Sequence, residues 1–138
     1  VGRAKAPQAD EMKRKREALR ENIDQGWKNM YESLADLYTD ATGHRPPDSD
    51  AADGIKMFYE TLRFPKQMKD NLHTLRKWRN ASIHGIKLED GTQVPWVDRP
   101  QGGPHGQPIF PEREEIKAVI AHIETSWLDE RLEQRQRQ

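Results

Sequence analysis

The chain has 138 residues, and with 33% hydrophobic residues and a mean hydropathy of −1.08 it fits one domain with a thin core. Lys plus Arg and Asp plus Glu both number 23, so the formal net charge is zero, which excludes an overall basic field for nucleic-acid binding. The absence of cysteine excludes disulfides and thiolate metal sites. No apolar run approaches the roughly 20 residues of a membrane helix. We therefore expect one soluble domain over residues 1–138, without a membrane partner and with the cytoplasm as its default location.

The first predicted element is a long helix from about Asp10 to Ala41. Its apolar residues recur at steps of four and three and form one stripe: Leu19, Ile23, Trp27, Met30, Leu34, Leu37 and Ala41. Gly43 is placed to cap its C-terminal end, and the two prolines that follow cannot continue a helix. We expect residues 1–9, ahead of this helix, to be frayed.

Two shorter helices are predicted next. Asp48, Ser49 and Asp50 supply N-caps for a helix from about Asp50 to Arg63. Its buried residues are Ile55, Phe58, Tyr59 and Leu62. Pro65 suits the first turn of a third helix that runs to about His84 and ends at Gly85. The apolar side of this third helix carries Met68, Leu72, Leu75, Trp78 and Ile83.

An irregular insertion separates the third helix from the last. Within residues 85–110, the Asp-Gly pair in the segment from Lys87 to Val94 predicts a short hairpin, and the rest is expected to be a loop. Trp96 can anchor this loop, meet a partner or touch RNA, and we favour anchoring. Pro111 and three following glutamates start the fourth helix. Its buried face is Ile116, Val119, Ile120, Ile123 and Trp127, and residues 130–138 are expected to fray. The predicted fold class is all-α, a four-helix, bundle-like domain with a loop and hairpin insertion before the last helix.

The third helix carries an unexpected polar cluster. Arg79 falls inside the apolar arc around Leu72, where a charge needs a carboxylate, a phosphate or a partner subunit to offset its desolvation. Beside that arc, Arg76, Asn80 and His84 follow one another at four-residue steps, with His73 near the line. Two guanidinium groups, an amide and an imidazole suit an anionic ligand. Such a set can cleave RNA without a metal, because an imidazole moves protons and a guanidinium stabilises phosphoryl charge.

The segment Leu75-Arg-Lys-Trp-Arg79-Asn80-Ala-Ser-Ile-His84-Gly85 resembles the HEPN superfamily. The resemblance implies an all-helical, commonly dimeric domain whose Arg-Asn-x-x-x-His motif forms a composite, metal-independent RNA-cleaving site at the dimer interface. It makes Arg79 and His84 the catalytic pair and Asn80 their polar support. It also fits a toxin or phage-defence role. The insertion before the last helix departs from the family pattern, and some members act as binding or dimerising modules without nuclease activity.

These residues lead to one main hypothesis and one rival. The first is a homodimeric endoribonuclease with Arg76 and His73 as substrate-binding residues, RNA as substrate and a protein antitoxin or regulatory protein as a further partner. The rival is a non-catalytic helical dimerisation or interaction module, in which Arg79 pairs with a carboxylate of the first or second helix. We expect no metal and no cofactor, since His44, His105 and His122 lack metal-ligand spacing.

Overall fold

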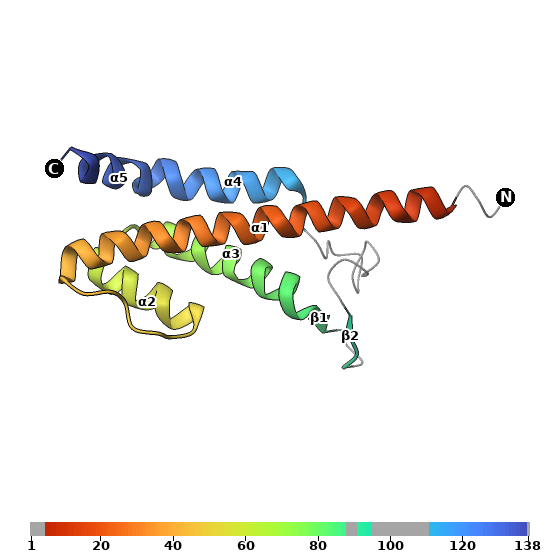
Figure 1. The fold of residues 1–138 in the computed structure, drawn as a ribbon, viewed down its shortest axis with the longest axis horizontal. Helices are drawn as coiled ribbons and strands as arrows, with labels where there is room; N and C mark the ends of the chain where they lie inside the picture. Colours follow the sequence, from red (N-terminus) through yellow and green to blue (C-terminus); the bar gives the residue numbers. More distant parts are fainter. Residues whose placement is uncertain (1–4, 88–90, 95–110, 138) are drawn as a thin grey trace.

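The computed structural model describes residues 5–87, 91–94 and 111–137, and within them the chain forms a bundle of helices (Figure 1). The longest, α1 (Lys5–Thr42), packs against α2 (Ala51–Leu62), α3 (Lys66–His84) and α4 (Arg113–Ile123), and in the view of Figure 1 it is drawn between α4 and the other two. α4 also packs against α3. A π-helical turn, Glu124–Leu128, joins α4 to α5 (Asp129–Gln136). The predicted all-α, bundle-like fold is confirmed.

The helix ends are set by the local signals that the sequence contains. Thr42 ends α1 immediately before Gly43, which has φ +83° and whose N–H donates to Thr39 O at 2.8 Å. Asp50 caps α2, because its carboxylate accepts a hydrogen bond from the Asp53 N–H at 2.9 Å. α3 ends at Gly85, whose N–H donates to Ala81 O. These boundaries agree with the predicted ones to within about two residues.

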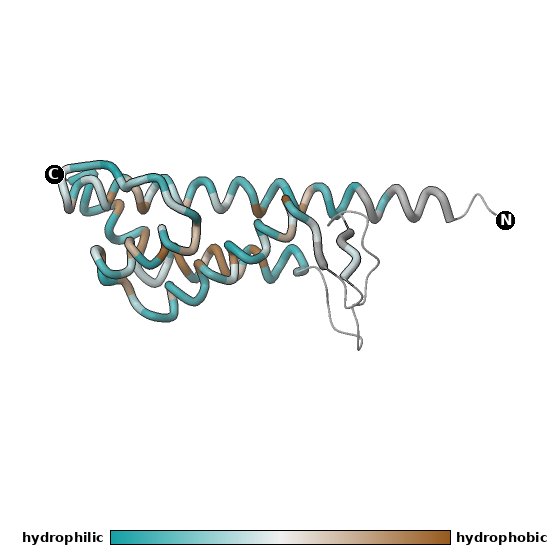
Figure 2. The backbone as a smooth tube through the Cα atoms, turned by 90° about the horizontal axis from the view of Figure 1, so that it is seen from below, coloured by the Kyte–Doolittle hydropathy of each residue, from teal (hydrophilic) through white to brown (hydrophobic). Residues whose placement is uncertain are grey.

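The core lies where the apolar faces of α1, α2, α3 and α4 meet. Its completely buried side chains come from all four helices: Ile23, Leu34, Ile55, Phe58, Met68, Leu72, Leu75, Ile116 and Ile123. Trp27 is buried too, while Trp78 and Trp127 pack partly buried against the core, as predicted. In Figure 2 the apolar positions recur as separate bands along the helices.

Two residues of the predicted apolar faces are not buried. Ala41 is exposed, because it lies in the last turn of α1. Ile83, in the last turn of α3, is 43% exposed. A helical wheel gives the direction of a side chain but not the point at which the neighbouring helices end. The prediction that Ile83 is buried was therefore wrong.

Both ends of the helical framework reach further than the sequence predicts. α1 begins at Lys5 rather than near Asp10, and its N-terminal part extends past the start of α4 (Figure 1). The chain remains helical to Gln136, where fraying from residue 130 was expected. Leu132 packs partly buried against the core, and Arg135 Nε donates to Asp40 Oδ2 at 2.6 Å. This contact joins α5 to α1.

A two-stranded hairpin follows α3, as predicted. β1 (Ile86–Lys87) pairs antiparallel with β2 (Gln93–Val94), with Ile86 opposite Val94. Gly91 of the predicted Asp-Gly turn has φ +88°, a conformation that favours glycine. The expected loop that follows, with Trp96 and His105, lies outside the described residues. None of the helices described combines the length and the apolar character needed to cross a membrane.

Candidate functional site

All five residues of the predicted site lie on α3, between His73 and His84. The Arg-Asn-x-x-x-His motif occupies the last turns of the helix, and Gly85, with φ +82°, ends it directly after His84. His84 is exposed. It lies at the carbonyl end of the helix, where the last carbonyl groups carry partial negative charge. An exposed imidazole in this position is accessible to a ligand from solvent.

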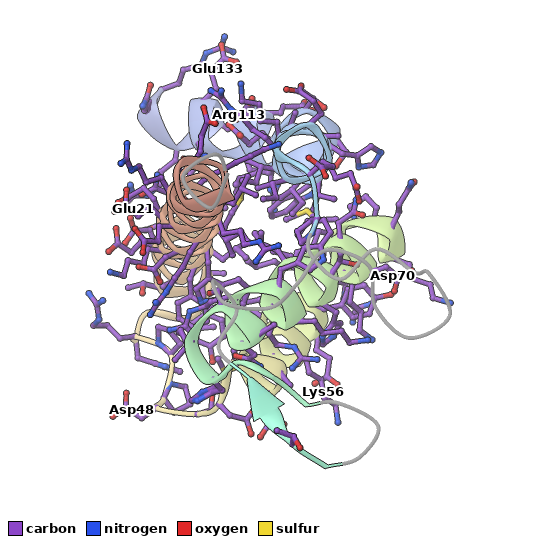
Figure 3. The ribbon with its side chains drawn as sticks, turned by 90° about the vertical axis from the view of Figure 1, so that its right-hand side faces the viewer. Glu21, Asp48, Lys56, Asp70, Arg113 and Glu133 are labelled. Atoms are coloured by element: carbon purple, nitrogen blue, oxygen red, sulfur yellow. The ribbon has the colours of Figure 1, made fainter. Side chains whose placement is uncertain are left out.

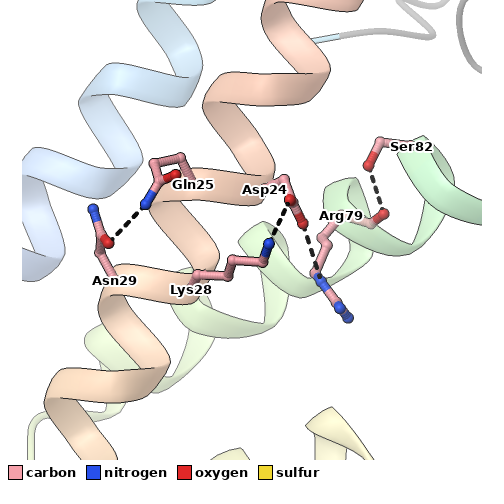
Figure 4. Close-up of polar contacts among 6 residues, drawn as sticks. All are labelled: Asp24, Gln25, Lys28, Asn29, Arg79 and Ser82. Atoms are coloured by element: carbon pink, nitrogen blue, oxygen red, sulfur yellow. Dashed lines mark hydrogen bonds and ion pairs between the residues drawn. The ribbon is translucent and has the colours of Figure 1, made fainter.

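Arg79 points from α3 toward α1 (Figure 4). Its Nε lies 3.9 Å from Asp24 Oδ1, and its guanidinium carbon is 5.9 Å from the centre of the Trp27 ring. The same Asp24 carboxylate is 3.3 Å from Lys28 Nζ. A distance of 3.9 Å is too long for a hydrogen bond, and the buried Arg79 Nε has no hydrogen-bond partner. Arg79 thus has the ion pair with the first helix that the rival hypothesis predicts, but in a weak form.

Arg79 and His84 do not point the same way. Five residues on an α-helix rotate the side-chain direction by about 500°, which leaves Arg79 and His84 roughly 140° apart. Successive members of the four-residue line Arg76, Asn80 and His84 differ in direction by only about 40°. Within one chain, the structure therefore places Asn80 and Arg76 on the flank of His84, and directs Arg79 into the bundle.

His73 and Arg76 form a contact on that same flank. Arg76 Nε donates to His73 Nδ1 at 3.3 Å, which requires that this ring nitrogen carry no proton. Burial lowers the pKa of His73, and the positive charges of Arg76, Lys69 and Lys77 lower it further, while Asp70 opposes them. The sequence placed His73 near the polar line but did not reveal that Lys69 and Lys77 act on it.

The two clefts beside Arg79 and the motif are acidic. The larger, of about 620 Å³, lies between α1, the loop after it and Arg79, and its charged lining is Glu32, Asp36, Asp48, Arg45 and Arg79. The second, of about 470 Å³, has Ser82 and the exposed Ile83 on one side and α1 on the other. Its lining from α1 is Glu17, Arg20, Glu21 and Asp24. Carboxylates outnumber cations in both, so neither cleft attracts phosphate in a single chain.

The side chains around the bundle are mostly charged and point outward, as Figure 3 shows for Glu21, Lys56 and Asp70. Among the residues described, no three His, Asp or Glu side chains are close enough together to hold a metal ion. Comparison of the chain with family models, curated proteins and solved structures gave no match. The functional argument therefore depends on the residues of α3 themselves.

Proposed function

We propose that the protein is a metal-independent endoribonuclease of the HEPN type that acts as a homodimer through a composite site. The observation that carries the proposal is the exposed His84 at the end of the Arg-Asn-x-x-x-His motif, with Asn80 and Arg76 leading to it along one flank of α3. An imidazole can act either as a proton acceptor or as a proton donor in general acid–base catalysis. Amide and guanidinium groups beside it suit a phosphodiester.

The proposed reaction is attack of the ribose 2'-oxygen on the adjacent phosphorus. One imidazole takes the 2'-hydroxyl proton, and a second protonates the 5'-oxygen as the bond from phosphorus to that oxygen breaks. The products are a 2',3'-cyclic phosphate and a 5'-hydroxyl. Arg79 stabilises the charge that develops on the phosphoryl oxygens, and Asn80 orients the groups.

A second copy of the chain supplies two things that this reaction requires and one chain lacks. One chain supplies a single His84, whereas the cleavage uses an acid and a base. Arg79 and His84 also point about 140° apart on their own helix. The 43%-exposed Ile83 lies in the same turn as His84 and offers apolar surface for a contact between copies. A role as a toxin or in phage defence, with a protein that neutralises the activity, belongs to the same proposal.

Cleavage of total RNA and tRNA in EDTA tests the proposal. The wild-type protein and the His84→Ala and His44→Ala variants are compared, since His44 is an exposed histidine at the far end of α1. We expect the wild type and His44→Ala to cut and leave 2',3'-cyclic phosphate ends, and His84→Ala to lose activity by at least about a hundredfold. Equal cutting by all three proteins, or none by the wild type, rejects the proposal.

The rival function is a non-catalytic helical dimerisation or interaction module. The ion pair of Arg79 with Asp24 and the contact of its guanidinium with Trp27 favour it, because they give Arg79 a structural role. The two acidic clefts, one lined by Arg79 and the other by Ser82 and Ile83, also suit a basic protein partner better than RNA. A wild-type protein that forms dimers and never cleaves RNA supports this function.

A further inference from the structure

One flank of α3 gathers positive charge along the whole length of the helix. At about 100° per residue, all side chains within an arc of roughly 100° on one flank of α3, beside the apolar arc around Leu72, are basic or polar. The basic members, which we call the α3 basic stripe, are Lys66, Lys69, His73, Arg76 and Lys77. Asn80 and His84 complete the same arc. Asp70, the single acidic residue of α3, falls just outside it.

The stripe is open to solvent and its charges are not neutralised. Lys66 and Lys77 are exposed, and Lys69 and Arg76 are partly exposed. Within the described part of the chain, none of these four cations forms an ion pair with a carboxylate. Lys69 Nζ lies instead 4.6 Å above the ring of Tyr59, which places this side of the stripe next to α2. A local positive surface therefore exists on a chain of zero net charge.

The lowered pKa of His73 is consistent with this local positive charge. Burial lowers the pKa of His73 most, and three cations of the stripe lower it further, against one opposing carboxylate, Asp70. The clefts that α1 borders have the reverse balance, with more carboxylates than cations. The two sides of α3 thus differ in the sign of their charge, and an anionic chain is attracted to the side that carries the stripe.

We propose that the α3 basic stripe binds the phosphate backbone of RNA and leads it to His84. This inference rests on the proposed function and adds the path of the substrate to it. From Lys66 to His84 the helix rises about 27 Å, so the stripe spans several consecutive phosphates. The arc contains no Phe, Tyr or Trp side chain on which a base can stack, and Trp78 of the same helix lies outside the arc and packs against the core. Binding is therefore independent of base sequence.

The composition of the arc favours RNA over an acidic protein. Protein interfaces are anchored by apolar, aromatic and arginine side chains that become fully desolvated. The arc has no apolar residue, and its exposed lysines suit a row of phosphates, which remain hydrated while counterions are released. Steps of three and four residues bring the Cβ atoms of neighbouring basic residues to within about 6 Å of each other along the helix.

The salt dependence of binding tests this path. A labelled single-stranded RNA of mixed sequence is titrated by fluorescence anisotropy, with the His84→Ala substitution in every protein so that the RNA stays intact. The test variant adds Lys66→Gln and Lys77→Gln, both at exposed positions. The matched control adds Lys28→Gln and Lys117→Gln, which remove the same charge from exposed positions of α1 and α4. Thermal unfolding of each variant verifies that it is folded.

We expect the logarithm of the association constant to fall with the logarithm of salt concentration with a slope of about −3 for four phosphate contacts. The test variant should reduce the magnitude of this slope by about 1.4 and weaken binding at least severalfold, while the control keeps the original slope. Runs of adenine and of uracil should bind with affinities within about threefold of each other.

Three results overturn the inference. Equal salt-dependence slopes for the test and control variants would show that the stripe does not contact the RNA. A strong preference between adenine and uracil runs would contradict binding through the phosphate backbone alone. Binding of polyglutamate through the same lysines, without RNA binding, assigns the surface to an acidic protein. If RNA binds through the stripe but the wild type never cleaves it, the proposed nuclease function is rejected and RNA binding by the stripe stands. If the wild type cleaves RNA and the test variant binds RNA as the control does, only the role of the stripe is rejected.

Discussion

Arg79 Nε of α3 lies 3.9 Å from Asp24 Oδ1 of α1, which is close enough for electrostatic attraction but too far for a hydrogen bond. Both side chains are about one-third exposed, so water screens the attraction between them. The buried Nε without a partner shows that α1 does not use the full hydrogen-bonding capacity of the guanidinium. The contact of Arg79 with α1 is therefore a weak one.

Asp24→Asn should leave the protein almost as stable as the wild type. Because the pair with Arg79 is long and partly exposed, we expect the free energy of unfolding in urea to fall by less than about 1 kcal/mol. Lys28→Gln, which removes the other cation near Asp24, is the control and should have an equally small effect. A loss above about 2 kcal/mol for Asp24→Asn alone would mean that the ion pair is a main structural contact, in favour of the interaction module.

Asp50→Ala should destabilise the start of α2. The carboxylate of Asp50 accepts a hydrogen bond from the Asp53 N–H, and loss of such an N-cap costs about 1 kcal/mol. Ser49→Ala is the matched control, since Ser49 is exposed next to Asp50 but does not cap the helix. Urea unfolding of the three proteins measures the difference, and an equal loss in both variants would show that Asp50 does not act as the cap.

Phe58→Ala should lower the free energy of unfolding much more than Asp50→Ala. The Phe58 side chain is completely buried, and its ring meets those of Tyr31 and Tyr38 edge to face at 5.2 and 5.8 Å between centroids. Removal of a buried phenyl group destabilises a protein by about 3–5 kcal/mol, a large part of the stability of a small domain. Lys56→Ala, on the exposed side of α2, should change the unfolding free energy by less than about 0.5 kcal/mol. Similar losses for both would place Phe58 outside the core.

Local sequence signals explain why most of the helical framework could be predicted. Asp50, Gly43 and Gly85 act on their own turns of backbone, and the apolar spacing of Leu19 to Leu37 follows from helix geometry alone. The C-terminal helix is different, because its contact between Arg135 and Asp40 joins residues 95 positions apart. No local pattern contains such a contact.

The candidate site was predicted in its residues but not in its arrangement. The spacing of Arg76, Asn80 and His84 fixes their shared flank, since all three lie on one helix. The partner of Arg79 could not be read from the sequence, because α1 carries several acidic residues and only packing selects Asp24. The exposure of Ile83 was missed because it depends on where the neighbouring helices end.

Gly54→Ala should be destabilising although alanine is the better helix former by about 1 kcal/mol. A Cβ atom on Gly54 would lie 2.8 Å from the hydroxyl oxygen of Tyr31, closer than van der Waals contact allows. We expect a net loss of about 1–3 kcal/mol, and a smaller loss when the same change is made together with Tyr31→Phe, which removes that oxygen. A double-mutant cycle in urea measures this coupling, and strictly additive effects would contradict the close approach.

His73→Gln should make the stability of the protein less dependent on pH below about 6.5. Burial and the cations Arg76, Lys69 and Lys77 lower the pKa of His73 in the folded state, so the unfolded chain binds more protons just below pH 6.5. His73 therefore makes the folded state lose stability as the pH falls through that window, and the neutral glutamine removes the effect. Urea unfolding at several pH values between 5 and 8 provides the comparison, with His44→Gln as a control on an exposed histidine. Titration of the imidazole by NMR should give His73 a pKa below that of a free histidine, and Arg76→Ala should raise it by removing one cation. A His73 pKa that stays unchanged in Arg76→Ala would contradict the contact between the two side chains.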